Sequence, residues 1–306
     1  MKRILVTPRS ATRDGHPALE KLRLAGYEVT LCRRGTLPSE EELLALLPGC
    51  VGYLAGVEPV PTTLLQAAAG LRAISRNGTG ADNIDLAAAE ALGIRVLRAE
   101  GANARGVAEL TLGLMLALAR SLPATDRALK AGAWQRFPAL ELAGKTLGLI
   151  GVGKIGRLVT GFAAALGMNV IGYDPYPTWN EAPSAFRYAL FDEVCAAADL
   201  LSLHSPPPAE GRPLLDAEGL ARLKHGVFLI NTSRAGLLET EALLAALESG
   251  HLAGLGLDVF DPEPPTDRRL LEHPRVIATP HIGGYTPESI DRAMDAAVDN
   301  LLAALT

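Results

Sequence analysis

The sequence has few cysteines, no excess of basic residues and no long apolar run, and each lack excludes a class of protein. The three cysteines, Cys32, Cys50 and Cys195, are widely spaced without a CxxC or Cys/His pattern, so neither a disulfide framework nor a zinc site is indicated. Basic residues number 29 against 34 acidic ones, which disfavours nucleic acid and anionic membranes as partners. No apolar run reaches the roughly 18 residues of a membrane span. We therefore expect a cytoplasmic protein that binds no metal, membrane or nucleic acid.

The pattern that is present is typical of an α/β protein. The 306 residues, 48% of them hydrophobic, suit about two domains. Short β-rich runs alternate with Ala/Leu-rich stretches of helical period, which predicts parallel sheets with crossover helices. A helix is expected to begin after Ser39, which with Glu42 has the spacing of a capping box. In the first third, strands are expected at residues 3–7, 27–32, 52–55, 73–76 and 95–98.

A long apolar helix separates two series of strands. It is expected over about residues 103–120, and because it is apolar on nearly every side we expect it to be buried. Burial within the chain is the first interpretation, and burial of part of its surface against a second subunit is the alternative. A polar stretch follows at 121–141, and a second βα series opens at Lys145. The pattern places a domain boundary near residue 99.

The strongest local motif is a glycine fingerprint between an apolar strand and a helix. Gly151 suits the tight turn, Gly153 lets the backbone approach a pyrophosphate, and Gly156 allows close helix–strand packing. The amides at the start of the helix, including those of Lys154 and Ile155, favour a bound anion. The alternative is a glycine-rich turn without a ligand.

A carboxylate follows at the distance expected for a ribose ligand. Asp174 ends the next strand, eighteen positions after Gly156. A carboxylate there accepts from the ribose hydroxyls and repels a 2′-phosphate, so NAD is expected in preference to NADP. The competing interpretation is a turn residue ahead of Pro175.

Three later strands end at polar residues of complementary chemistry. Arg234, Glu263 and His281 follow apolar runs, and ligands of open α/β sheets bind beyond the carboxyl ends of the strands. Arginine holds a carboxylate with two parallel donors, histidine exchanges a proton near neutral pH, and glutamate fixes the histidine tautomer. Hydride transfer between a nicotinamide and a 2-hydroxy or 2-oxo acid needs this set. Taken singly, each residue could equally be a surface charge, a loop acid or a capped strand end.

Three further strand-end residues are assigned to the cofactor side. Asp258 is expected to accept from the nicotinamide carboxamide, with capping of the following turn as the alternative. For His204, a cofactor contact and a packing role are equally consistent with the sequence. Thr232 is expected to contact the cofactor.

Taken in order, these motifs resemble the D-isomer-specific 2-hydroxyacid dehydrogenase family. The resemblance covers almost the whole chain. It rests on residues 76–85, 107–110, the fingerprint at 151–156, 231–234, 257–264 and 279–284.

The resemblance implies a role for each matched residue. Arg234 would bind the substrate carboxylate and carbonyl, His281 would be the general acid/base, and Glu263 would pair with it. The loop that starts at Arg76 would line the substrate pocket. Its expected substrate contacts are Arg76 and the backbone amides of Asn77, Gly78 and Thr79.

The family architecture is two Rossmann-like or flavodoxin-like domains, one inserted into the other. It implies a substrate domain at residues 1–98 plus 283–306 and an NAD-binding domain at 99–282, with a cleft that closes on substrate. Homodimers built around the long helix are usual in the family. The sequence ends without the regulatory extension of some phosphoglycerate dehydrogenases, so we expect no serine feedback through such a domain.

Departures from the family pattern concern the substrate. Arg76 matches a phosphate-contacting arginine, which favours 3-phosphoglycerate, whereas Glu58 stands in a loop where such enzymes tend to be basic and would repel a phosphate if it faced the cleft. Thr79 and Glu263 disfavour phosphite and formate dehydrogenases. Residues 205–212 depart from the usual Pro-Leu-Thr pattern, which leaves the adenine-side contacts open. The expected function is an NAD-dependent dehydrogenase of a small 2-hydroxy acid, with a glyoxylate/hydroxypyruvate reductase or an NAD(H)-sensing corepressor-like binding protein as alternatives.

Overall fold

The structure is a computed structural model that describes residues 2–208 and 211–306. The chain forms two compact units, one up to Asn103 together with Thr286–Thr306, and one over Ala104–Tyr285, which we call unit 1 and unit 2. The expected boundaries were 98/99 and 282/283, and the chain leaves unit 1 later because the long helix begins only at Ala104. Both units contain a sheet in which every strand pair is parallel, which confirms the predicted fold class.

Unit 1 is a five-stranded sheet with the strand order β2-β1-β3-β4-β5. Its strands are β1 (Lys2–Val6), β2 (Tyr27–Leu31), β3 (Cys50–Ala55), β4 (Ala73–Arg76) and β5 (Arg95–Arg98). Its helices are α1 (Arg9–Asp14), α2 (Leu19–Leu24), α3 (Glu40–Leu46), α4 (Thr62–Ala67), α5 (Leu86–Ala91) and α13 (Pro287–Leu305). All five strands expected in this part of the sequence are present, with ends that shift by one or two residues.

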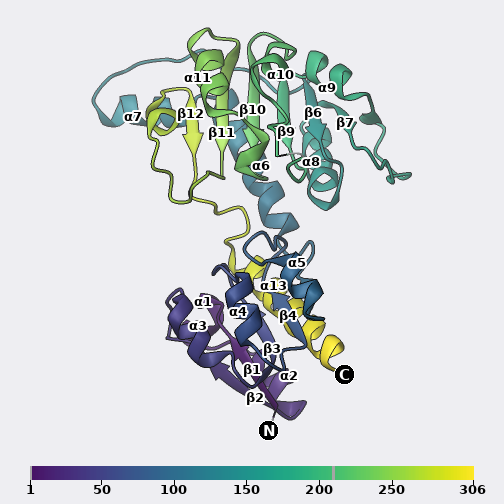
Figure 1. The fold of residues 1–306 in the computed structure, drawn as a ribbon. Coiled ribbons are helices and arrows are strands. Elements are labelled where there is room, and N and C mark those ends of the chain that lie inside the picture. The colour runs from purple at the N-terminus through teal and green to yellow at the C-terminus, as the bar shows by residue number, and fades with distance from the viewer. Residues whose placement is uncertain (1, 209–210) are drawn as a thin grey trace. The chain divides into compact units, whose positions relative to one another are not determined.

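The last helix of the chain completes the core of unit 1. Helix α13 packs on the sheet strands β3, β4 and β5, and its Met294 and Leu301 are fully buried with Ile4 and Leu54 (Figure 1). A Cβ at Gly52 would lie 2.9 Å from a methyl carbon of Leu305, so a larger residue there would force the side chains of the helix to shift. A segment far along the sequence is therefore an integral part of the N-terminal unit.

Unit 2 is a seven-stranded sheet with the strand order β12-β11-β10-β9-β6-β7-β8 (Figure 1). Its strands are β6 (Thr146–Ile150), β7 (Asn169–Tyr173), β8 (Phe186–Tyr188), β9 (Leu200–Leu203), β10 (Val227–Asn231), β11 (Leu252–Leu257) and β12 (Val276–Ala278). Its helices are α6 (Ala104–Ala119), α7 (Leu122–Lys130), α8 (Lys154–Ala165), α9 (Phe191–Ala197), α10 (Ala217–Ala221), the 3-10 turn η1 (Ala235–Leu237), α11 (Thr240–Glu248) and α12 (Arg269–Glu272). The order runs outward in both directions from β6 and β9, which makes the gap between these two strands the topological switch point where dinucleotides bind.

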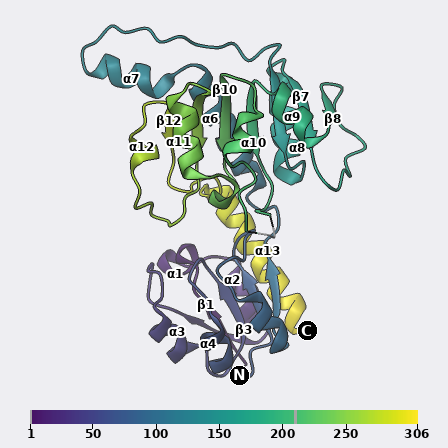
Figure 2. The same ribbon diagram turned by 45° about the horizontal axis from the view of Figure 1, so that its top comes forward.

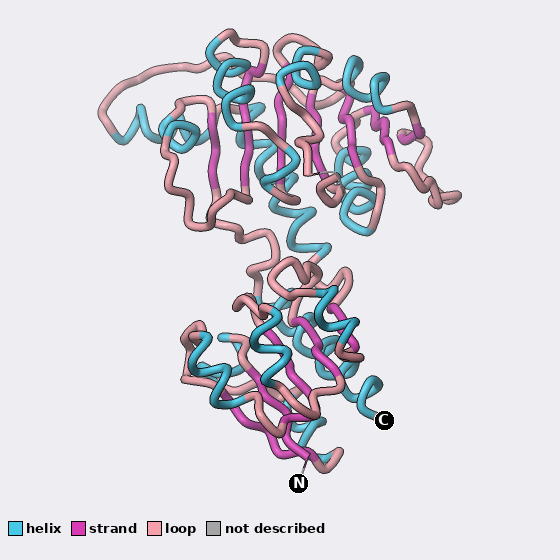
Figure 3. Tube along the Cα trace, in the orientation of Figure 1, coloured by secondary structure: helices cyan, strands magenta, loops and turns pink. Residues whose placement is uncertain are grey.

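Helices cover both faces of the unit 2 sheet: in Figure 3, cyan helices lie in front of the magenta strands and behind them. Helix α6 packs against α8, β10 and β11. Its Ala108 and Met115 are fully buried, which confirms the expected buried helix. Among the described residues no single helix is long and apolar enough to cross a membrane; α6 and α7, bent by 61° at their junction, satisfy the length and composition test only as a pair.

The expected capping box is half formed. Ser39 Oγ accepts from the amide of Glu42 at 3.2 Å and caps α3. Glu42 does not return to the Ser39 amide as expected, because its carboxylate accepts from the amide of Arg33 at 2.6 Å instead. The competing donor lies on a loop that precedes the helix and that local sequence spacing does not reveal.

Candidate active site

The glycine fingerprint forms a tight turn between β6 and α8. Gly151 has a φ of +96°, and a Cβ there would lie 2.5 Å from the carbonyl oxygen of His204. A Cβ at Gly156 would lie 2.3 Å from the carbonyl oxygen of Gly151. These two glycines are therefore required by the packing of the turn itself, as their positions in the motif predict.

Gly153 differs from the other two glycines because a Cβ there would meet nothing within 4 Å. It precedes the first residue of α8, Lys154, and the helix is twelve residues long. The backbone is thus bare and open at the N-terminus of a helix that carries a full dipole. This combination fits a pyrophosphate, which needs close backbone approach and free helix-start amides.

Asp174 follows β7 and is tied to the glycine turn. One carboxylate oxygen accepts from the amide of Val152 at 2.8 Å, and the other accepts from the amide of Tyr176 at 2.9 Å. The turn interpretation and the ribose interpretation are therefore compatible, since each oxygen keeps acceptor capacity for a hydroxyl. The described residues fit an adenosine ribose beside a pyrophosphate.

His204 lies across the switch point from Gly151, at the end of β9. Its Nε2 is 2.9 Å from Ser202 Oγ, and its Nδ1 is shielded from solvent and has no hydrogen-bond partner among the residues that the structure describes. Enclosure of the ring lowers the pKa of His204 to about 4, so the imidazole is neutral at pH 7. Thr232 is also buried, with its hydroxyl 3.0 Å from that of Thr111 on α6. Packing contacts therefore account for both residues, and their contacts with NAD stay predictions.

Arg234 follows β10 in a turn that a buried amide side chain organises. Asn231, fully buried at the end of the strand, donates from Nδ2 to the carbonyl oxygen of Arg234 at 2.8 Å and accepts from the amide of Ser233 at 3.0 Å. The guanidinium donates to the carbonyl oxygen of Ser233 at 2.8 Å. Asn231 was not among the predicted site residues; its place at the end of an apolar run, three positions before the arginine, is the signal that would have found it.

Glu263 and His281 are brought together from loops that follow neighbouring strands. Nδ1 of His281 lies 2.7 Å from Oε2 and 3.0 Å from Oε1 of Glu263. Glu263 also accepts from the amide of Phe260 at 3.0 Å, which orients the carboxylate. The histidine ring therefore presents its other nitrogen, Nε2, for proton exchange. The loop of Arg234 follows β10, which is next to β11 in the same sheet.

The backbone at His281 is held in an uncommon conformation by a second carboxylate. His281 has a φ of +53°, which few residues other than glycine adopt. Asp258, 1% exposed, accepts from the amides of Ile282 and Gly283, each at 2.8 Å, and from Thr279 Oγ1 at 2.6 Å. Asp258 thus caps and shapes the turn that carries the histidine, as its alternative interpretation as a turn cap predicted. Its contact with the nicotinamide stays a prediction.

The expected substrate loop lies in unit 1, between β4 and α5. The amides of Asn77 and Gly78 donate to the carbonyl oxygens of Ala55 and Arg76, both at 2.8 Å. These two amides are therefore not available to a substrate in this structure, because they hold the loop itself. The guanidinium of Arg76 lies across Gly78, where a Cβ would be 1.6 Å from its Nη1.

Two other amides of the same loop are unbonded within the described part of the chain, which leaves them able to donate to an anion. Among the described residues, the amides of Thr79 and Gly80 make no hydrogen bond. Gly80 was not among the predicted residues, and no sequence signal separates it from its neighbours. The hydroxyl of Thr79 is 2.9 Å from Oδ1 of Asn103.

Glu58 does not face solvent. It is 1% exposed and accepts hydrogen bonds from Thr7, Tyr53 and the amide of Gly56. The condition under which it would repel a phosphate directly, a carboxylate open to the cleft, is not met. Of the stretch 205–212, residues 209 and 210 lie outside the described part of the chain.

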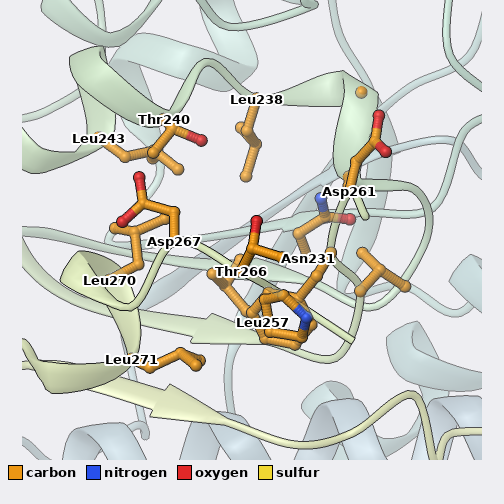
Figure 4. Close-up of a pocket in the computed structure, with 15 residues that line it drawn as sticks. Asn231, Leu238, Thr240, Leu243, Leu257, Asp261, Thr266, Asp267, Leu270 and Leu271 are labelled. Carbon is orange, nitrogen blue, oxygen red and sulfur yellow. The ribbon is translucent and has the colours of Figure 1, made fainter. Parts of the chain in front are cut away.

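A pocket in unit 2 is lined by residues that lie close to Arg234 and Glu263 along the chain (Figure 4). Its lining includes Ala235 beside the arginine and Asp261 two positions before the glutamate. Asn231 and Leu257 close one side, at the ends of β10 and β11. No group of three His, Cys, Asp or Glu side chains in residues 2–208 and 211–306 is arranged to hold a metal ion.

The fold and this site define a dinucleotide-binding oxidoreductase scaffold with an imidazole–carboxylate pair. The family model described as "D-isomer specific 2-hydroxyacid dehydrogenase, NAD binding domain" matches residues 112–283, which are more than half of the chain. The chain belongs to the D-isomer-specific 2-hydroxyacid dehydrogenase family, and NAD is its cofactor.

Individual relatives extend the likeness over nearly the whole chain. A hydroxypyruvate reductase from Thermotoga maritima is 40% identical over 272 residues, which cover 87% of this chain and 88% of the relative. A D-3-phosphoglycerate dehydrogenase from Mycobacterium leprae is 40% identical over 88% of this chain but only 52% of its own length, so the chain spans about half of that relative. A D-lactate dehydrogenase from Aquifex aeolicus, solved with NAD and lactic acid, superposes with a TM-score of 0.84 at 28% identity, covering 98% and 94% of the two chains.

Proposed function

We propose that the protein is an NAD-dependent D-2-hydroxyacid dehydrogenase that acts as a reductase of small 2-oxoacids and, in reverse, oxidises the 2-hydroxyacids. The observation that carries the proposal is the 2.7 Å contact between His281 Nδ1 and Glu263 Oε2 at the strand ends of an NAD-binding domain. NADH, when bound, supplies the hydride that reduces the carbonyl carbon.

The residues of the chain supply the proton and the orientation. His281 in its protonated form donates the Nε2 proton to the carbonyl oxygen, and Glu263 stabilises the protonated ring and holds its direction. Arg234 binds the substrate carboxylate through two parallel hydrogen bonds. Asp258 and Asn231 act through the backbone, since each fixes the turn that carries one of these side chains.

The proposal is tested by NADH oxidation across a substrate series. Glyoxylate, pyruvate, hydroxypyruvate and phosphonooxypyruvate increase in size and then add a second anion, so the order of kcat/KM reports both properties of the pocket. We expect turnover with at least one unphosphorylated member. Absence of turnover with all members, together with tight NADH binding, would instead support a binding protein.

A second candidate substrate is 3-phosphoglycerate, oxidised at its 2-hydroxyl group. The position of Arg76 favours it, because the guanidinium lies across the loop at Gly78 and donates to the carbonyl oxygen of Asn77, which places a cation on the substrate loop. The M. leprae relative is named for this activity. Phosphonooxypyruvate in the series above decides between the candidates.

We also propose a homodimer that uses α6 and the segment after it. Helix α7 has no buried residue, and the segment from α7 to β6 extends away from the rest of unit 2 (Figure 2). Leu122, Leu129 and Trp134 on it are 52%, 57% and 81% exposed, and Leu116 of α6 is exposed too. Such apolar exposure on an extended segment fits burial against a second copy of the chain.

Sedimentation velocity tests the dimer. Wild type is expected to sediment as a dimer, and the double substitution Leu129→Glu with Trp134→Ala is expected to shift it toward monomer. A monomeric wild type would contradict the proposal.

A cytoplasmic location also remains our proposal, which the three buried free thiols support.

A further inference from the structure

The carboxylate of Glu58 is buried in unit 1 at the end of β3. A single oxygen, Oε1, accepts from three donors: the hydroxyl of Thr7, the hydroxyl of Tyr53 at 2.6 Å and the amide of Gly56 at 2.8 Å. Thr7 and Tyr53 are themselves 1% and 0% exposed. Burial and the neighbouring Glu58 carboxylate raise the pKa of Tyr53 well above its usual value, so its hydroxyl remains a donor at any physiological pH.

These buried hydrogen bonds fix the backbone of residues 55–60. Gly56 has no room for a side chain, because a Cβ there would lie 2.7 Å from Glu58 Oε2. The same Gly56 amide that donates to Glu58 belongs to a peptide whose carbonyl, that of Ala55, accepts from the amide of Asn77 at 2.8 Å. A charged acceptor on the N–H side of a peptide polarises its carbonyl and strengthens the next hydrogen bond in the chain.

The segment 55–60 anchors the substrate loop at its other end as well. Asn83 donates from Nδ2 to the carbonyl oxygens of Glu58 at 2.6 Å and Gly56 at 3.3 Å. The amide of Val60 donates to the carbonyl oxygen of Asn83 at 2.7 Å. The loop between Asn77 and Asn83 is thus held at both ends by the segment that Glu58 fixes, and the amides of Thr79 and Gly80 lie between the two anchors.

We propose that Glu58 is a positioning residue for substrate binding: its buried carboxylate sets the place of the Thr79 and Gly80 amides that receive the substrate carboxylate. The inference rests on the proposed function for the identity of the ligand, but the anchoring itself does not depend on it. Glu58 touches neither substrate nor NAD in this role, and the residues of the glycine fingerprint belong to unit 2.

The experiment combines hydrogen exchange with steady-state kinetics on the whole protein. Glu58→Gln keeps an acceptor oxygen but loses the charge, and Glu58→Ala removes the acceptor. Glu41→Gln, an exposed acid of the same unit, is the matched control. Amide exchange in a peptide covering 76–85 is expected to accelerate about tenfold in Glu58→Gln and further in Glu58→Ala, as expected for weakened bonds to a charged group. KM for the 2-oxoacid is expected to rise in the same order, with the Kd for NADH and the saturating kcat within about twofold of wild type.

The results separate the two proposals. Faster exchange in 76–85 together with a raised KM supports the positioning role, and loss of thermal stability alone, with KM unchanged, overturns it. Unchanged exchange at 76–85 in a folded Glu58→Gln protein also overturns it, whatever the activity. If the wild type turns over no 2-oxoacid while exchange still accelerates, the anchoring role of Glu58 is supported and the proposed function fails.

Discussion

Nδ1 of His281 lies 2.7 Å from the carboxylate of Glu263, although helix α12 and the edge strand β12 separate the two residues along the chain. The contact assigns the nitrogens of the ring: Nδ1 points at the carboxylate and Nε2 is left for the substrate. Both residues are partly exposed, with 52% and 38% of their side chains accessible, so a small acid can reach the pair.

Removal of the imidazole tests its role in proton transfer. His281→Ala is expected to lower kcat by roughly a hundredfold or more, because a positioned acid/base is lost, while NADH binding measured by fluorescence stays nearly unchanged. His225→Ala, an exposed histidine of the same unit, serves as the control and is expected to retain wild-type turnover. Near-normal turnover of His281→Ala would remove this residue from the mechanism.

Replacing the partner carboxylate tests the orientation of the ring. Glu263→Gln is expected to lower kcat by roughly tenfold or more, because the amide group of Gln can offer a donor to Nδ1 and favour the wrong tautomer. Initial rates at saturating NADH provide the measurement, and Glu272→Gln is the exposed control. Equal kcat values in wild type and Glu263→Gln would show that the pair is only structural.

The ribose contact is tested by the choice of cofactor. Asp174→Ala is expected to shift the ratio of kcat/KM for NADH over NADPH toward NADPH by roughly tenfold or more, because a 2′-phosphate is no longer repelled. Asp174→Asn keeps acceptors for the amides of Val152 and Tyr176 and isolates the effect of charge. An unchanged ratio in both variants would mean that the ribose is held elsewhere.

The buried carboxylate behind the histidine turn is expected to affect both stability and rate. Asp258→Asn places an amide group against the amides of Ile282 and Gly283, which costs about 1–3 kcal/mol for a lost buried acceptor. Thermal unfolding and kcat are measured together, and both are expected to fall. Asp261→Asn, exposed in the adjacent loop, is the control. Wild-type kcat in a destabilised Asp258→Asn protein would separate this carboxylate from the placement of His281.

The enclosed histidine at the switch point predicts a pH dependence of stability. The pKa of His204 is lowered from 6.5 to about 4 in the folded protein, so between these values the unfolded chain binds the additional proton. The free energy of unfolding is therefore unaffected by this histidine above pH 6.5. It falls as the pH drops from 6.5 toward 4, by about 3 kcal/mol in total, because protonation favours the unfolded chain. Thermal midpoints at pH 7 and pH 4.5 are expected to differ less in His204→Gln than in wild type. An equal difference in both proteins would contradict the assignment.

Much of the fold was predictable because it depends on local pattern. The strands of unit 1 and the long helix were expected from apolar runs and helical period, and the glycines at 151 and 156 from steric demands that adjacent elements impose. The order of the strands within each sheet was not predicted, because it depends on pairing between segments that are distant along the chain. Asp174 was found by its distance from the fingerprint, which one βαβ unit sets.

Most differences from the expectations concern hydrogen-bond partners. The amides of Asn77 and Gly78 were expected to bind substrate, yet they bond to Ala55 and Arg76. Glu58 was expected to repel a phosphate if it faced the cleft, and it is instead a buried acceptor. Asn231 was missed although its place at the end of an apolar run marks it, and Gly80 was missed because an unbonded backbone amide leaves no distinctive mark in the order of residues.

Residue order alone determined which chemical groups this protein possesses and which secondary-structure element each one ends, since apolar period, turn glycines and strand ends are properties of neighbouring positions. Tertiary structure decided the partners of the buried donors and acceptors that lie far apart along the chain. Hydrogen bonds act over about 3 Å in space, whatever the separation along the chain, so the partners of Glu58, Asp258 and His281 became defined only when each unit had folded and brought segments after different strands together.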